Sequence, residues 1–331
     1  MIVANFYHLK NTNGLFYYGV DYLSEDLGKV RKILVRASLA NATRQVLPGV
    51  EVVSCTAGSL VREVLRAALR GDFIYTPSSH PLPFISQQMI VVHDVFPFFG
   101  FKGKVKELLL RLSLATSGCR VGYINNSDAR AFAGKLGADH PKGLFAPNKF
   151  PAPMQVAPVG AQPGGPLHVG LFGTDSAKKN YAELFAQILL RNAGKRVRFL
   201  VYGHKTAYYE ELVRQFPEID LQLVESDKCS LTRFLEQIRI IASVADHEGF
   251  GRPIAAALLA NIPTLLVQRP VFVEFFQGGA QFRATIPEVV DRILELASEP
   301  VIQPVSYSPP AAVVDGYRSA VAYLQSQAAV A

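Results

Sequence analysis

The sequence predicts an α/β protein of two doubly wound domains that face each other across a cleft. The 331 residues exceed what one ordinary hydrophobic core accommodates, so two domains of about 150 to 170 residues are expected. Short β-type runs alternate with helical patterns in both halves, which is typical of parallel sheets covered by helices. Between the halves, Pro151 to Pro166 (PAPMQVAPVGAQPGGP) combine Pro, Gly and small residues without apolar periodicity, as linkers do.

The first domain is predicted over residues 1–150. Its β-type runs are Ile2–His8, Lys32–Arg36, Val50–Ser54, Phe73–Thr76, Met89–His93 and Val121–Asn125. Helical apolar periodicity falls between them, for example over Ser59–Gly71 and Lys104–Ala115. Parallel strands need such crossover connections, so this half is expected to form one sheet with helices on its faces.

The second domain is predicted over residues 167–305. Its β-type runs are Leu167–Gly173, Val197–Gly203, Leu221–Glu225, Ile240–Ala245, Ile262–Gln268 and Ala280–Ala284. Its helical patterns are Tyr181–Asn192, Ala207–Gln215, Pro253–Leu259 and Pro287–Ala297. Residues 306–331 form a C-terminal tail with a helix expected over Tyr317–Leu324. Because ligands of such sheets bind beyond the carboxyl ends of the strands, the cleft between the domains is the expected site.

The composition is that of a globular, basic protein. Hydrophobic residues make up 49% and charged residues 18% of the chain, which excludes intrinsic disorder. The charge balance of 34 − 27 = +7 favours an anionic partner: phosphorylated small molecules, an acidic membrane surface or nucleic acid. Nucleic acid ranks third, because the Lys and Arg residues are scattered and never run longer than two.

The cysteines and the apolar segments of the chain bear on the cellular compartment in which the protein is expected. Cys55, Cys119 and Cys229 form no C-x-x-C pair, which indicates neither a disulfide framework nor a zinc site, and favours buried thiols in a reducing cytosol. The first residues do not resemble a secretory leader, and no segment approaches the ~18 to 20 apolar residues that span a bilayer. We therefore expect a cytoplasmic protein that at most lies on the inner face of the cell membrane.

The segment Asp246–Pro263 (DHEGFGRPIAAALLANIP) gathers two glycines and a proline where a helix is expected to begin. Pro253 suits the first helical turn, and Gly249 and Gly251 let the backbone turn sharply and approach a ligand. Such a helix start at the carboxyl edge of a sheet favours an anion, because free N–H groups and the helix dipole point the same way. The alternative is a glycine-rich loop that only turns the chain.

Several segments carry a family resemblance in the same order along the chain. They are NTNGLFYYGVDYLSEDL (residues 11–27), VVHDVFPF (91–98), INNSDARAFAGKLG (124–137), GTDSAKKN (173–180), and EGFGRP (248–253) with NIPTLLV (261–267). Together they resemble the retaining GT-B glycosyltransferases, family 4 and relatives, which take in many enzymes of bacterial polysaccharide and lipopolysaccharide synthesis. The resemblance covers most of the chain.

The resemblance implies a fold and an activity. The fold would be two Rossmann-like domains facing across a cleft, with the C-terminal helix crossing back onto the first domain. The activity would be transfer of a hexose or deoxyhexose from a nucleotide-diphosphate sugar to a cell-surface glycan, free or lipid-linked, with retention of configuration. The nucleotide sugar is the donor substrate, and neither a cofactor nor a metal is implied.

The resemblance also implies roles for particular residues. Glu248 would contact the donor sugar and support the oxocarbenium-like centre, and His93 would contact the transferred sugar or its phosphate. Lys179 would stabilise the negative charge on the leaving phosphates, so the implied catalytic residues are these three. The implied donor-binding residues are Gly173, Thr174, Lys178, Lys179, Gly249, Phe250, Gly251 and Arg252. On the acceptor side the resemblance implies Gly14, with Asn13 beside it, and Asp94.

Structural interpretations of the same residues stay open. The two lysines could be solvated loop residues, Glu248 a carboxylate that favours a helix start, and His93 a strand-end histidine hydrogen-bonded to the next turn and capped by Asp94. An H-E-x-x-H zinc motif is excluded, because Gly251 stands four residues after His247.

The sequence departs from the family pattern at the position of a second Glu, which in the family commonly binds the nucleotide ribose. The family has a second Glu eight positions after the first, and here that position is Ala256. This departure leaves two alternatives open: a catalytically silent GT-B subunit that binds a nucleotide or a glycan beside a partner enzyme, and a sugar-nucleotide epimerase. A phosphorylase is disfavoured because no environment for a pyridoxal lysine is recognisable.

Residues 96–114 (FPFFGFKGKVKELLLRLSL) combine aromatic and basic side chains. The residues concerned are Phe96, Phe98, Phe99, Phe101, Lys102, Lys104 and Lys106. One interpretation is an interfacial surface that touches anionic lipid, as a lipid-linked acceptor would favour. The other is that the Phe side chains belong to the core and the Lys side chains to a solvated helix face.

Overall fold

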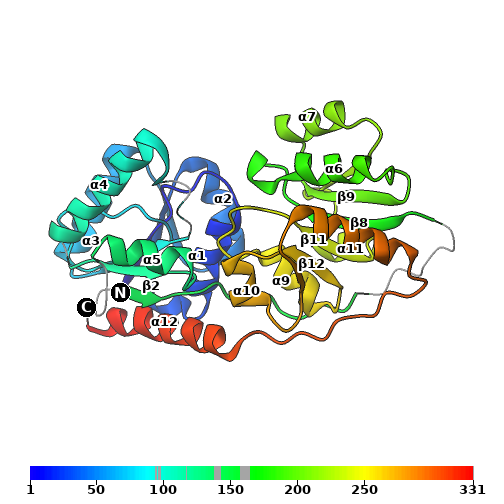
Figure 1. Ribbon diagram of the computed structural model, residues 1–331. Coiled ribbons are helices and arrows are strands. Elements are labelled where there is room, and N and C mark those ends of the chain that lie inside the picture. Colours follow the sequence, from blue (N-terminus) through cyan, green and yellow to red (C-terminus); the bar gives the residue numbers. More distant parts are fainter. Residues whose placement is uncertain (94, 96–97, 117, 138–142, 157–164, 331) are drawn as a thin grey trace. The chain divides into compact units, whose positions relative to one another are not determined.

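The computed structural model describes residues 1–93, 95, 98–116, 118–137, 143–156 and 165–330. The chain divides into two units: the first comprises Met1–Lys149 and Ala311–Ala331, and the second Phe150–Pro310. Each unit has its own parallel sheet with helices on both faces (Figure 1), which confirms the predicted α/β fold of two doubly wound domains. Asp94, Phe96 and residues 157–164 of the predicted linker lie outside the described residues.

The described part of the first unit contains a seven-stranded parallel sheet with the order β3-β2-β1-β4-β5-β6-β7. The strands are β1 (Ile2–Asn5), β2 (Val30–Val35), β3 (Glu51–Ser54), β4 (Phe73–Thr76), β5 (Gln88–Val92), β6 (Arg120–Tyr123) and β7 (Gly143–Phe145). Every residue of β1, β4 and β5 is buried, as expected for central parallel strands covered on both faces. All strands predicted for this half are present. The edge strand β7 is too short for its pattern to be predicted.

Six helices are described in the first unit, and two of them begin at side-chain caps. The six are α1 (Gly14–Ser24), α2 (Ala37–Val46), α3 (Ala57–Leu69), α4 (Gly100–Thr116), α5 (Asp128–Lys135) and α12 (Ala311–Val330). The Asn13 side chain accepts hydrogen bonds from Leu15 N and Phe16 N at the start of α1, and Thr56 and Ser59 form a capping box on α3.

Helix α12 ties the end of the chain to its beginning. It contacts β4 and β7, and the Tyr317 hydroxyl donates to Asp21 O at 3.1 Å and to Glu25 Oε1 at 2.9 Å. The Met1 amino group donates to Ala328 O at 3.3 Å, so the two termini lie side by side (Figure 1). The helix is longer than the predicted Tyr317–Leu324.

The described part of the second unit contains a six-stranded parallel sheet with the order β10-β9-β8-β11-β12-β13. The strands are β8 (Leu167–Phe172), β9 (Val197–Gly203), β10 (Asp220–Glu225), β11 (Ile240–Ser243), β12 (Thr264–Val267) and β13 (Gln281–Arg283). The helices are α6 (Tyr181–Leu190), α7 (Ala207–Gln215), α8 (Leu231–Leu235), α9 (Arg252–Leu259), α10 (Pro270–Phe276) and α11 (Ile286–Ser298). The strands predicted for this half are all present.

The strand orders locate a switch point in each sheet. In the first sheet the chain leaves the pair β1/β4 in opposite directions, and in the second sheet it does so at β8/β11. The connections that follow these strands therefore lead to opposite sides of each pair, and open α/β sheets bind ligands at such switch points.

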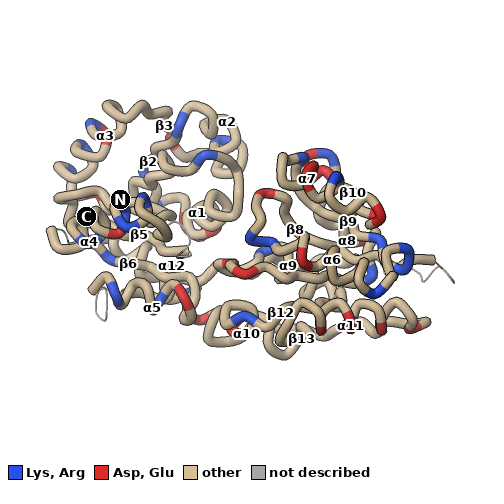
Figure 2. Tube along the Cα trace, turned by 45° about the horizontal axis from the view of Figure 1, so that its top comes forward, with Lys and Arg blue, Asp and Glu red and all other residues tan. Residues whose placement is uncertain are grey.

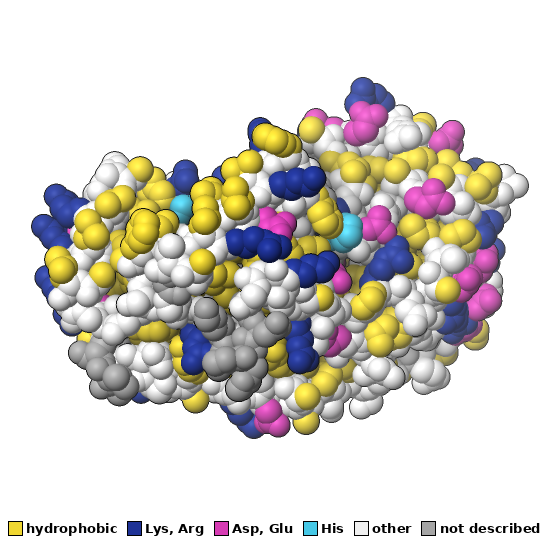
Figure 3. All heavy atoms as spheres, turned by 60° about the vertical axis from the view of Figure 1, so that its left-hand side comes forward, with side chains coloured by type: hydrophobic (Ala, Val, Ile, Leu, Met, Phe, Trp, Pro, Cys, Tyr) yellow, Lys and Arg dark blue, Asp and Glu magenta, His cyan; other side chains and the backbone are white. Residues whose placement is uncertain are grey.

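Charged residues are spread over many elements (Figure 2), whereas several of the exposed apolar residues lie on α4 or next to its start. Figure 2 shows Lys, Arg, Asp and Glu spread over many elements of both units, with no single basic stripe. Phe98 is buried and packs against Phe132, whereas Phe99 and Phe101 are 57% and 84% exposed at the start of α4. Leu108 and Leu112 continue this exposed face, and hydrophobic side chains interspersed with basic ones are visible on the side that carries α3 and α4 (Figure 3).

Candidate functional site

The loop after β8 is shaped around Lys179. Gly173 has a φ of +84°, and a Cβ atom there would lie 2.9 Å from Lys179 Cε and 3.2 Å from Nζ. A glycine at this position therefore makes room for the lysine side chain to fold back over the end of the strand. A 3₁₀ turn over Ala177–Lys179 and a left-handed Asn180 then lead into α6.

The loop after β11 is hydrogen-bonded to the loop after β8. Asp246 N donates to Lys178 O at 3.0 Å, and the Asn180 side-chain amide donates to Val244 O at 3.3 Å. Arg269 pairs with the Asp246 carboxylate at 2.7 Å. Burial alone would raise the pKa of Asp246, but the Asn180 amide and Arg269 together hold that pKa below its usual range. The two loops are thus held together at the switch point of the second sheet.

Lys179 and Glu248 meet where the two loops converge. Lys179 Nζ lies 2.5 Å from Glu248 Oε1, and the side chains are 13% and 18% exposed. Two residues that lie 69 positions apart in sequence therefore form one partly buried ion pair. An anion that enters this site meets an ammonium group already held in place, and has to share it with the carboxylate.

Helix α9 begins beside this pair. Gly251 precedes it with a φ of +88°, and Pro253 lies in its first turn. The N-cap residue of α9 is thus a glycine, which has no side chain of its own to cap the helix. The positive end of the helix dipole therefore faces the loop that carries Glu248. Arg252, the first residue of α9, is partly buried there.

Two of the predicted donor-binding residues use their side chains to hold the loops. The Phe250 side chain is 3% exposed and packs edge-on against Phe275, with a ring distance of 4.8 Å. The Thr174 hydroxyl donates to His204 O at 2.6 Å. Any contact of Phe250 with a ligand would therefore come from its backbone. Ala256, at the position of the missing second carboxylate, is 2% exposed within α9.

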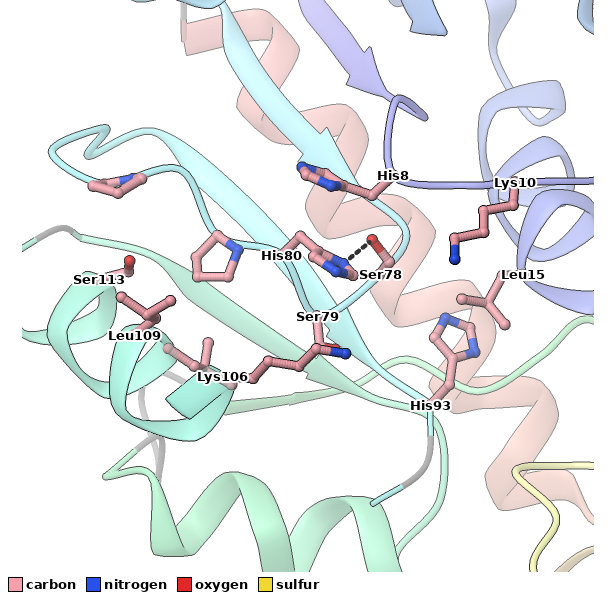
Figure 4. A pocket seen from close by; sticks show the side chains of 13 residues that line it. His8, Lys10, Leu15, Ser78, Ser79, His80, His93, Lys106, Leu109 and Ser113 are labelled. Atoms are coloured by element: carbon pink, nitrogen blue, oxygen red, sulfur yellow. Dashed lines mark hydrogen bonds between the residues drawn. The ribbon is translucent and has the colours of Figure 1, made fainter. Parts of the chain in front are cut away.

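His93 lies in the first unit, in a pocket of about 460 Å³ beyond the carboxyl ends of β1, β4 and β5 (Figure 4). Its Nε2–H donates to Pro77 O at 3.0 Å, and the Tyr18 ring packs edge-on against it. Burial lowers the pKa of His93 to about 4, so the ring is neutral at pH 7. Because Nε2 carries the proton, Nδ1 is left as an acceptor.

The same pocket contains a stacked histidine pair that the sequence did not reveal. His8 follows β1 and His80 follows β4, and their rings stack with centroids 4.3 Å apart and planes 6° apart. The Ser78 hydroxyl lies 3.1 Å from His80 Nδ1. Burial, and then His8 and Lys106, lower the pKa of His80 to about 4. The available signal was positional: both histidines follow the strands that flank the switch point.

The predicted residues thus fall into two groups, one in each unit. Gly173, Lys178 and Lys179 are brought together with Glu248 and the start of α9 in the second unit. In the first unit, Gly14 begins α1, and the neighbouring Leu15 lines the pocket together with His93. Among the described residues, no group of three or more His, Cys, Asp and Glu side chains is placed to hold a metal ion.

Neither a protein-family model nor a curated protein sequence matches the chain. Solved structures match it in fold. HepE from Anabaena, crystallised in complex with UDP and glucose, matches with a TM-score of 0.69 at 14% identity over 99% of this chain and 94% of that one. WaaG, a glycosyltransferase involved in lipopolysaccharide biosynthesis, matches with a TM-score of 0.61 at 10% identity over 100% and 96%. The lipopolysaccharide outer core galactosyltransferase WaaB matches with a TM-score of 0.56 at 12% identity over 90% and 92%. The chain therefore has the GT-B fold, in agreement with the prediction.

Proposed function

We propose that this protein is a glycosyltransferase that moves a hexose or deoxyhexose from a nucleotide-diphosphate sugar to a cell-surface glycan. The observation that carries the proposal is the Lys179–Glu248 pair, which lies at the switch point of the second sheet beside the start of α9. A fold shared with glycosyltransferases such as WaaG and WaaB supports it, and so does a net charge of +7, which suits a phosphorylated donor.

In the proposed reaction, the bond between the anomeric carbon and the diphosphate oxygen breaks, and the anomeric carbon forms a bond to an acceptor hydroxyl oxygen. Lys179 would stabilise the charge that develops on the leaving diphosphate, with Lys178, Arg252 and the positive end of α9 around it. These groups supply the positive charge that the leaving group needs, and we propose that the reaction requires no metal. Glu248 would face the donor sugar, and retention of configuration is proposed on the family resemblance.

His93 would contact the transferred sugar. Its Nε2–H is already donated to Pro77 O, and its pKa of about 4 keeps the ring neutral at physiological pH. The Nδ1 atom that remains is an acceptor, which suits a sugar hydroxyl better than a phosphate oxygen.

The proposal is tested by calorimetric titration with UDP, GDP, ADP and their deoxy forms, followed by a donor-consumption assay with sugars of whichever nucleotide binds. UDP is the first to test, because HepE was crystallised with UDP. Micromolar binding of one nucleotide is expected. The proposal fails if none of them binds more tightly than about 1 mM, a free energy of only about −4 kcal/mol.

We further propose that the protein works in the cytoplasm and docks on the inner membrane surface through α4. The exposed Phe99 and Phe101 and the basic Lys102 and Lys104 suit the boundary of an anionic bilayer, as a lipid-linked acceptor would require. Within the described residues, no helix is long and apolar enough to span a membrane. Sedimentation with phosphatidylglycerol vesicles tests this, with pure phosphatidylcholine vesicles as control. Binding should fall when Phe101 is replaced by Ser, and equal binding to both vesicle types would contradict the proposal.

The silent-subunit alternative rests on Ala256. Its side chain is buried within α9, so that position supplies no carboxylate to a ribose. This alternative predicts nucleotide or glycan binding without donor consumption, even when acceptor extracts are added. The enzyme proposal predicts turnover under the same conditions.

A further inference from the structure

The pocket of the first unit has a charge pattern that the proposed transfer chemistry leaves unexplained. Two lysines line it: Lys10 from the loop after β1 and Lys106 from α4. None of its described lining residues is acidic, and among the described residues neither lysine has an ion-pair partner. The other polar groups are hydroxyls and histidine rings.

We propose that this pocket binds an anionic group, a phosphate or a carboxylate, carried by the acceptor glycan. Identifying the ligand as an acceptor rests on the proposed glycosyltransferase function, whereas the anion site itself is inferred from the pocket alone. It narrows the acceptor from any cell-surface glycan to one that bears negative charge near the hydroxyl to be glycosylated.

The geometry of the pocket supports an anion at its centre. In Figure 4 the Lys10 and Lys106 side chains point into the pocket from opposite sides, with Ser78 and His80 between them. Ser78 is buried, and its hydroxyl lies 3.1 Å from His80 Nδ1. Two ammonium groups and these polar hydrogen-bonding groups surround one space, which suits the several acceptor oxygens of a phosphate or carboxylate.

The size and walls of the pocket fit a sugar unit attached to that anion. Its volume of about 460 Å³ lies in the range of about 300–1,000 Å³ that small-molecule sites occupy. Leu15, Leu109 and Pro81 form apolar parts of the wall, against which the C–H face of a sugar ring can pack. His93 lines the same pocket, so the transferred sugar that it is proposed to contact would lie next to this ligand.

The donor diphosphate already has a proposed site in the second unit. Its proposed partners, Lys178, Lys179 and the start of α9, all belong to the second unit. Lys10 and Lys106 belong to the first unit and to a different sheet. We therefore assign this pocket to a second anionic ligand, and the dependence of UDP binding on Lys106 tests that assignment.

The test is calorimetric titration of the full-length protein, without nucleotide, with glucose 6-phosphate, glucuronate and glucose as probes. At least one anionic sugar should bind at least about tenfold more tightly than glucose. Lys10→Ala and Lys106→Ala should each weaken that binding by about tenfold and leave any glucose binding unchanged. Lys135→Ala is the matched control, because Lys135 is an exposed lysine of the same unit that does not line this pocket. Circular dichroism establishes that each variant is folded.

The outcomes separate the inference from the proposed function. Preference for glucose 6-phosphate identifies a phosphate and preference for glucuronate a carboxylate, and either supports the site. Equal binding of glucose and both anions, or an equal loss in Lys135→Ala and Lys106→Ala, overturns it. If UDP binding depends on Lys106 as strongly as probe binding does, the pocket serves the donor and the acceptor assignment is wrong. If the anionic sugars bind but no nucleotide does, the anion site stands and the transferase function falls.

Discussion

The two members of the Lys179–Glu248 pair are predicted to respond differently to substitution: replacing Lys179 should weaken nucleotide binding, whereas replacing Glu248 should not. The ammonium of Lys179 is held 2.5 Å from Glu248 Oε1, so a diphosphate bound as proposed would compete with the carboxylate for the same donor hydrogens. Replacing Lys179 by Met removes the donor. Replacing Glu248 by Gln removes the competing charge and leaves the donor in place.

The expected changes in UDP affinity and in stability follow from the fact that both members of the contact are charged. A hydrogen bond to a charged group contributes about 1.5–3 kcal/mol, so Lys179→Met should weaken UDP binding by about 10- to 150-fold. Glu248→Gln should leave UDP affinity unchanged or raise it a few-fold, while donor consumption falls by about tenfold or more because the proposed contact of Glu248 with the sugar is lost. Both variants lose a partly buried ion pair, and a fall in stability of about 1–2 kcal/mol is expected for each.

The assay is calorimetric titration with UDP and, in parallel, release of UDP from a UDP-sugar. Lys205→Met is the matched control, because Lys205 is a lysine of the same unit in an exposed pair with Glu210 and should bind UDP like the unaltered protein. The reasoning is refuted if Glu248→Gln weakens UDP binding as much as Lys179→Met does. In that case the pair would only hold the two loops together.

Three further predictions follow from the geometry. Gly173→Ala places a methyl group 2.9 Å from Lys179 Cε on a backbone with φ +84°, and should cost about 1–2 kcal/mol in urea unfolding and weaken UDP binding as Lys179→Met does. Burial depresses the pKa of His80 and of His93 to about 4, so between pH 6.5 and 4 the unfolded chain binds protons that the folded chain does not. The free energy of unfolding should therefore fall as the pH is lowered from 6.5 to 4, by up to about 3 kcal/mol for each histidine. Urea unfolding at several pH values measures this fall, which should be smaller in a variant with both histidines replaced by Gln. Phe250→Ala should lower the free energy of unfolding by about 3–5 kcal/mol, because its ring is buried against other aromatic rings.

Local sequence patterns were sufficient to predict most of the regular elements, but β7, α8 and α10 were not among them. The run VRFLVYG forms β9 over Val197–Gly203, and the periodic segment Ala207–Gln215 forms α7, both with the predicted ends. These patterns work because a buried parallel strand needs a continuous apolar run and a helix needs a 3.6-residue repeat, and both requirements are met within a few neighbouring residues. The two loops of the second unit that carry the predicted site residues also follow directly after strands, β8 and β11, as predicted.

The sequence by itself determined that Gly173, Lys179, Glu248 and Gly251 would lie at carboxyl ends of strands. Only the tertiary structure decided that Lys179 and Glu248 touch, that His8 stacks on His80, and that Phe98 is buried while Phe101 is exposed. The reason is that contacts between distant residues depend on which strands are neighbours in a sheet. Strand order is set by the packing of the whole domain, and no short segment of the chain records it.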